Sequence, residues 1–123
     1  MKRVSLELFI PENSKEKVIY RTMEETEYPE LGIVVPKGFY TDGASVPKLF
    51  RGIFPDIHQY FPATLLHDYL IFERRKVGKM TSKIRKEIDK KFYNQLLKIG
   101  VSKTRSKIMY LGVRIYAFFN YRK

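Results

Sequence analysis

The sequence predicts an α+β fold, with a small N-terminal antiparallel sheet followed by three helices. Residues 1–36 contain short stretches in which apolar and polar residues alternate, the period of a half-buried strand. From about residue 60 the apolar residues instead recur every three or four positions, the period of an amphipathic helix. A chain of 123 residues is large enough for one core. We therefore expect a single domain with a sheet region (1–36), a loop region (37–61) and a helical region (62–123).

Three strands are expected in the sheet region. Residues 4–10 alternate between apolar and polar side chains and predict the first strand, which the following proline and its polar neighbours end. Residues 17–23 predict the second strand, and the short apolar run 31–36 predicts the third. The acidic residues 24–30 lie between the second and third strands and are expected to be a connection. Short strands joined in this way favour antiparallel pairing.

Two helices with clear boundaries should follow the loop region. The apolar period predicts helices at residues 62–74 and 82–99, packed antiparallel. Thr81 or Ser82 is a suitable N-cap for the second of them, because a side-chain oxygen can accept a bond from a free backbone N–H. Gly100 is expected to end this helix, since glycine readily adopts the left-handed conformation that follows many helices.

A third helix is expected at about residues 102–121, with apolar side chains around most of its circumference. Such a helix is either well buried, or part of its apolar surface contacts a partner or a membrane surface. The chain contains no run of 18 apolar residues, so no membrane-spanning helix is expected. It also lacks cysteine, and its first residues do not have the long apolar stretch of a signal peptide. These features predict a cytoplasmic protein.

The net charge of +11 is concentrated in the C-terminal part of the chain. Residues 74–123 contain 16 of the 24 basic residues and 2 of the 13 acidic ones. Such a segment attracts polyanions, which could be nucleic acid, an anionic lipid surface or an acidic host protein. It is equally typical of a solvated surface that keeps a protein soluble. Four basic residues in and after the first helix are the candidates for anion binding: Arg74, Arg75, Lys76 and Lys79.

His67 and Asp68 are adjacent in the apolar first helix and are the main candidates for chemistry. On a helix their side chains point about 100° apart, so they cannot pair well with each other. Each needs a separate partner, because burying an unpaired polar group is costly. Asp89 lies at the edge of the apolar stripe of the second helix, half in the core, where antiparallel packing can bring it to His67. Asp89 would orient one ring N–H, and the other ring nitrogen could act as a general base.

Asp68 could instead share a hard cation with Asp42. The segment 41–45 groups a carboxylate with hydroxyl and carbonyl oxygens, the ligands that calcium prefers. The cation would polarise a carbonyl group and stabilise an oxyanion. The alternative is metal-free: Asp42 bonds nearby N–H groups of its turn, and Asp68 either caps backbone N–H groups or is neutralised by a cation such as Lys48 or Arg51.

Several motifs, taken in order, resemble a family of small phage and prophage proteins catalogued as a domain of unknown function. The resemblance spans roughly residues 33–119. It rests on four motifs: Val-Pro-Lys-Gly-Phe at 35–39, Thr-Asp-Gly-Ala-Ser-Val-Pro at 41–47, Leu-His-Asp-Tyr-Leu at 66–70, and Asp89 with Phe92 and Leu96. It implies a phage accessory protein in the cytoplasm of the host cell and supplies no activity.

A weaker resemblance is to the catalytic core of secreted phospholipase A2, especially its bacterial forms. In that core an Asp-Gly-Cys-Ser loop precedes a helical His-Asp pair, and a later helix contributes an Asp before a Phe. The resemblance implies an antiparallel catalytic helix pair and metal-assisted ester hydrolysis. It assigns roles to four residues: Asp42 and Asp68 as calcium ligands, His67 as general base and Asp89 as the residue that orients it. Ala44 replaces the loop cysteine, and Ile71 replaces a tyrosine that would support Asp89.

The residues leave three classes of function open. The first is a hydrolase that uses the His67–Asp89 pair. The second is an inert relative in which the same polar cluster is a buried structural network. The third is a basic binding module for nucleic acid or a host protein, including a protein of host defence. The distance between His67 and Asp89, and the convergence of Asp42 with Asp68 on one point, are the observations that bear most directly on the choice among these classes.

Overall fold

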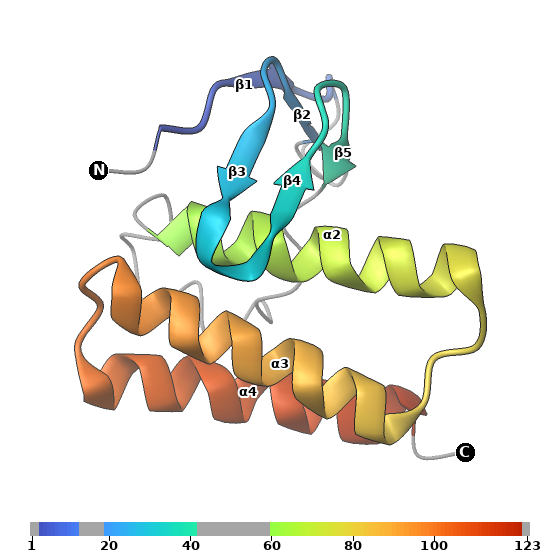
Figure 1. Ribbon diagram of the computed structural model, residues 1–123, viewed down its shortest axis with the longest axis vertical. Helices are drawn as coiled ribbons and strands as arrows, with labels where there is room; N and C mark the ends of the chain where they lie inside the picture. Colours follow the sequence, from blue (N-terminus) through green and yellow to red (C-terminus); the bar gives the residue numbers. More distant parts are fainter. Residues whose placement is uncertain (1–2, 13–18, 42–59, 122–123) are drawn as a thin grey trace. The chain divides into compact units, whose positions relative to one another are not determined.

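The computed structural model describes residues 3–12, 19–41 and 60–121. The chain divides into two compact units, Met1–Gly43 and Ala44–Lys123. The first unit contains the strands and the second contains the helices, as Figure 1 shows. The α+β arrangement predicted from the sequence is therefore confirmed.

The strands of the first unit form two small antiparallel sheets. One has the strand order β1-β2-β5, built from β1 (Leu6–Phe9), β2 (Ile19–Thr22) and β5 (Tyr40–Thr41). The other pairs β3 (Thr26–Tyr28) with β4 (Ile33–Val35) through the short 3-10 helix η1 (Pro29–Leu31). Gly32 follows η1 with a φ of +64°, a conformation that glycine adopts without strain.

Strand β3 corrects the expectation that residues 24–30 only connect two strands. Thr26 and Tyr28 are buried and Glu27 between them is exposed, which is the alternation of a strand. The acidic neighbours hide this three-residue pattern in the sequence. Thr22, at the end of β2, is bonded to the segment between β4 and β5. Its hydroxyl donates to the carbonyl of Pro36 at 2.7 Å and accepts from the N–H of Phe39 at 2.9 Å.

The second unit consists of α2 (Phe61–Val77), α3 (Ser82–Lys98) and α4 (Lys103–Tyr121). Successive helices run in opposite directions, and α3 contacts both α2 and α4 (Figure 1). The predicted antiparallel packing of the first two helices is therefore present. A buried cluster forms the core of the unit: Tyr60, Ala63, Phe92, Leu96, Met109 and Val113. Within the described parts of the chain, no helix has the length and apolarity needed to cross a membrane.

The ends of α3 follow from local chemistry. The Thr81 hydroxyl accepts a hydrogen bond from the N–H of Ile84 at 3.2 Å, so the N-cap expected from the sequence is in place. At the other end Gly100 has a φ of +95°. Its N–H donates to the carbonyl of Leu97, and that of Val101 donates to Leu96. These contacts fix the turn into α4 and hence the antiparallel course of the chain.

Candidate functional site

Asp89 is the centre of a buried polar cluster that connects α2, α3 and α4. Its Oδ1 accepts a hydrogen bond from Nε2 of His67 at 2.5 Å and another from Nε of Arg85 at 2.8 Å. Its Oδ2 accepts from Nη1 of Arg114 at 2.8 Å. The contact between His67 and Asp89 that the sequence predicts is therefore present. Because three donors bond to the carboxylate and both of its oxygens are paired, Asp89 tolerates burial without exposure to water. The sequence had led us to expect a side chain half in the core.

Helix geometry explains how these side chains meet. Arg85 precedes Asp89 by four residues, so both lie on one face of α3. Antiparallel packing of α2 against α3 places His67 opposite that face. The His67 ring also packs against Phe92, one turn after Asp89, with ring centroids 5.0 Å apart. The cluster is thus held by apolar packing as well as by hydrogen bonds.

The charges in the cluster fix the protonation of both partners. Burial by itself raises the pKa of Asp89, but the hydrogen bonds from His67 and Arg85 and the positive charge of Arg85 outweigh it and leave that pKa below its usual value. Burial lowers the pKa of His67, and the positive charge of Arg85 adds to this effect, against the opposing influence of Asp89. At neutral pH the cluster therefore holds a carboxylate beside a neutral imidazole.

The two nitrogens of the His67 ring have different roles in this arrangement. A carboxylate can only accept hydrogen bonds, so the ring proton must be on Nε2. The neutral ring then has a lone pair on Nδ1. Nδ1 is buried and has no hydrogen-bond partner among the described residues. An unpaired buried polar atom is uncommon in a folded protein, and Nε of Arg74 is the other such atom among the described side chains. A lone pair held in a fixed orientation can take a proton from a reacting group that reaches it.

Reasoning from the sequence missed both arginines. Arg85 could have been found from its spacing of four residues to Asp89, which favours an ion pair on one helix. Arg114 is the only charged residue between Tyr110 and Tyr121, and an isolated cation in an apolar helix indicates a buried partner. Its partner, however, is on another helix, 25 residues away in the chain.

The structure describes one of the two predicted metal ligands. Asp42 lies outside the described residues. Asp68 is half-buried on α2, immediately after His67. Among the side chains that the structure describes, no three His, Cys, Asp or Glu residues come close enough to hold a metal ion.

The four predicted anion-binding residues lie at and just beyond the C-terminal end of α2, where cations are favoured by the helix dipole. Arg74 is half-buried, and its Nη2 donates to the carbonyl of Lys79 at 3.4 Å. The Lys76 ammonium lies 5.8 Å from the ring centre of Phe72. Arg75, Lys76 and Lys79 are exposed. Arg74 therefore serves the local structure, and the other three present positive charge to solvent.

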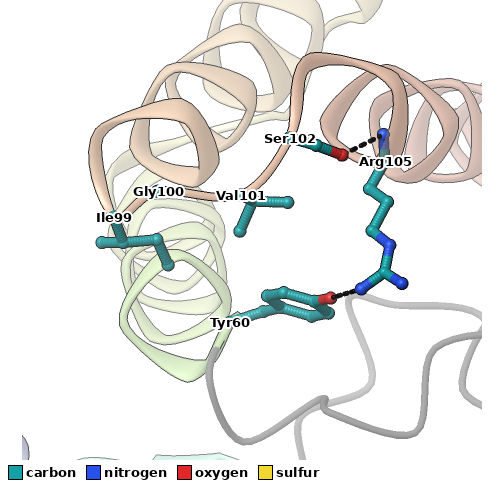
Figure 2. Close-up of a pocket in the computed structure, with 6 residues that line it drawn as sticks. All are labelled: Tyr60, Ile99, Gly100, Val101, Ser102 and Arg105. Atoms are coloured by element: carbon teal, nitrogen blue, oxygen red, sulfur yellow. Dashed lines mark hydrogen bonds between the residues drawn. The ribbon is translucent and has the colours of Figure 1, made fainter.

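A pocket of about 280 Å³ lies beside the turn from α3 to α4 (Figure 2). Nη1 of Arg105 donates to the Tyr60 hydroxyl at 3.2 Å across it, and the Arg105 N–H donates to the Ser102 hydroxyl at 3.2 Å. Six residues line it: Tyr60, Ile99, Gly100, Val101, Ser102 and Arg105. None of the predicted site residues is among them, so this pocket and the Asp89 cluster are separate features.

Comparison with known proteins identifies a family. A family model described as "Protein of unknown function (DUF1353)" matches residues 13–113, which is most of the chain. Comparisons with curated proteins and with solved structures found no match.

Proposed function

Since the chain belongs to the DUF1353 family, whose function is unknown, we propose its activity from the Asp89 cluster: hydrolysis of an ester with Nδ1 of His67 as general base. One observation carries this proposal. Nε2 of the buried ring is held by Asp89, while Nδ1 has no partner among the described residues. A network with a purely structural role is expected to pair both ring nitrogens, because each unpaired buried polar atom costs stability.

The proposed reaction needs a water molecule and an ester, and both must reach Nδ1, which is buried in this structure. Nδ1 takes a proton from the water, and the oxygen of that water attacks the ester carbonyl carbon. The bond from this carbon to the alkoxy oxygen then breaks, and the leaving oxygen takes the proton back from Nδ1. The products are a carboxylic acid and an alcohol, and the neutral imidazole is regenerated. Asp89 keeps the ring in the required tautomer and stabilises the imidazolium.

The two arginines support this role of Asp89. In the phospholipase A2 core that the motifs resemble, a tyrosine four residues after the histidine supports the orienting aspartate, and this chain has Ile71 there. Arg85 and Arg114 donate to Asp89 instead. Burial lowers the pKa of His67 and the positive charge of Arg85 adds to this effect, so the base is unprotonated at neutral pH.

A mutant pair tests the hydrolase. His67→Gln retains an amide N–H that can reach Asp89 but removes the Nδ1 base, so we expect activity on phospholipids or activated esters to fall by about 10²–10⁴-fold. The melting temperature should change by only a few degrees. His58→Gln, at the only other histidine, is the control and should retain activity. Full activity of His67→Gln, or wild type that hydrolyses no ester, would refute the proposal.

We include calcium in the proposal, with Asp42 and Asp68 as its carboxylate ligands; when bound it would polarise the ester carbonyl. Of these two ligands the structure describes Asp68 alone, and the hydrolytic step is assigned to His67 and Asp89 without the metal. Calcium should raise the melting temperature of wild type by mass action, and a chelator should reverse the rise. Asp68→Asn should abolish the shift. If the melting temperature of wild type does not shift, calcium has no part in the mechanism. The role of His67 and Asp89 is tested separately, by the hydrolysis assay of His67→Gln.

A second candidate function is binding of a polyanion by the basic residues at the C-terminal end of α2. It is favoured by the exposure of Arg75, Lys76 and Lys79. If the ligand is nucleic acid, the affinity should fall steeply with salt through counterion release. Charge reversal at these three residues and Arg74 should abolish binding, whereas reversal of Lys86 on α3 should not. An acidic host protein, including one of host defence, is the alternative ligand for a phage protein acting in the host cytoplasm.

A further inference from the structure

Helix α4 presents an apolar face on the side opposite to the core. Its buried residues Met109, Val113 and Ala117 recur every four positions and are 0–3% exposed. On the other side, apolar residues at spacings of three, four and three share one face, since residues at these spacings are neighbours on a helix. We call these residues the outer face of α4: Ile108 (38% exposed), Leu111 (50%), Ile115 (56%) and Phe118 (57%).

The neighbouring helix shows that this face is unusual. The exposed side of α3 carries Lys83, Lys86, Glu87 and Lys90, which is the usual composition of a solvated helix surface. The outer face of α4 has no charged side chain among its four residues. A continuous apolar row of this kind on the surface of a folded unit indicates an interaction surface.

Charge indicates what covers this face. Helix α4 contains no acidic residue, and Lys103, Arg105 and Lys107 are exposed in the turns that lead to Ile108. A second copy of the chain would bring the same positive charges against them, and like charges repel across an interface. An anionic lipid surface attracts these cations and accepts the apolar side chains beneath its headgroups. This combination is typical of a helix that lies in the plane of a membrane interface.

We propose that the outer face of α4 binds the surface of an anionic lipid bilayer, with the helix axis parallel to the membrane and Lys103 and Lys107 near the headgroups. The face is formed by residues that the Asp89 cluster does not use, so the proposal does not rest on hydrolytic activity. It requires three properties together: dependence on negatively charged lipid, weakening by salt, and dependence on the four apolar side chains.

Tryptophan fluorescence offers a direct test, because the chain contains no tryptophan. Phe118→Trp places a reporter on the outer face, and Phe72→Trp places a matched reporter on α2 at a phenylalanine of similar exposure, 49%. Vesicles of phosphatidylglycerol and phosphatidylcholine should shift the emission of the Phe118→Trp variant to the blue, and brominated lipid should quench it. Vesicles of phosphatidylcholine alone should not. The Phe72→Trp emission should stay unchanged in both.

Sedimentation with the same vesicles tests the residues. The double variant Leu111→Ser/Ile115→Ser should lower the partition to anionic vesicles at least tenfold. Val77→Ser, at a valine of α2 that is more exposed than either of these residues, should leave the partition within twofold of wild type. Lys107→Glu should weaken binding more than Lys90→Glu on α3.

Three results would overturn the proposal. The first is an unshifted Phe118→Trp emission on anionic vesicles, or equal shifts at both reporters. The second is a double variant Leu111→Ser/Ile115→Ser that partitions to anionic vesicles as strongly as wild type. The third is a wild-type protein that is a dimer in sedimentation velocity without vesicles, together with a double variant that is a monomer. A second copy of the chain would then cover the face.

Discussion

Replacing Asp89 with asparagine should destabilise the helical unit by about 3–5 kcal/mol, the cost of removing one partner from a buried ion pair. Asp89 is fully buried and accepts three hydrogen bonds, two of them from arginines. Asparagine has nearly the same shape but no charge, and its amide group turns a donor toward these donors. Arg85, 2% exposed, would then hold a buried charge without its carboxylate. For a unit of this size the loss corresponds to a melting temperature lower by roughly 12–40 °C.

Urea unfolding followed by circular dichroism measures this loss as a free energy of unfolding. Glu87→Gln is the matched control, because it removes the same charge from an exposed position two residues earlier on α3 and should change stability by no more than about 0.5 kcal/mol. Adding Arg114→Gln to Asp89→Asn should recover part of the loss, since one stranded cation is removed. If Asp89→Asn loses less than about 1 kcal/mol, or no more than Glu87→Gln, the cluster does not stabilise the fold in the way its geometry indicates.

Three further predictions concern single residues. Because the pKa of His67 is lowered in the folded state, the unfolded chain takes up this proton at a higher pH than the folded chain does. The free energy of unfolding of wild type should therefore be constant above about pH 6.5, the ordinary pKa of histidine, and decline below it. His67→Gln should flatten this decline, and equal pH profiles for the two proteins would contradict the prediction. Thr81→Ala should cost about 1 kcal/mol through loss of the N-cap, measured by urea unfolding, whereas Ser82→Ala leaves the cap in place and should be nearly neutral. Gly100→Ala, at a φ of +95°, should cost about 1 kcal/mol or more in the same measurement, and Gly78→Ala, at a φ of 176°, should not; similar losses at both glycines would rule out conformational strain as the reason.

Local patterns were sufficient to predict the architecture and one contact of the site. The change of period near residue 60 predicted strands followed by helices, and the N-cap at Thr81 and the stop at Gly100 predicted where α3 begins and ends. The contact between His67 and Asp89 also followed from pattern, because two amphipathic helices that pack antiparallel bring their inner faces together. Strand β3 escaped prediction because three residues carry too little periodic signal inside an acidic run.

The sequence by itself determined which residues are candidates, namely a histidine and an aspartate on the inner faces of two helices. Only the tertiary structure decided how the aspartate is neutralised. Arg114 meets Asp89 because α4 packs on α3 with one particular rotation about its axis, and apolar residues around most of a helix do not specify that rotation. The same rotation buries Met109, Val113 and Ala117 and leaves Leu111 and Ile115 exposed. Periodicity fixes which residues share a face, but which of two apolar faces is buried depends on the shape and charge of the surface it packs against.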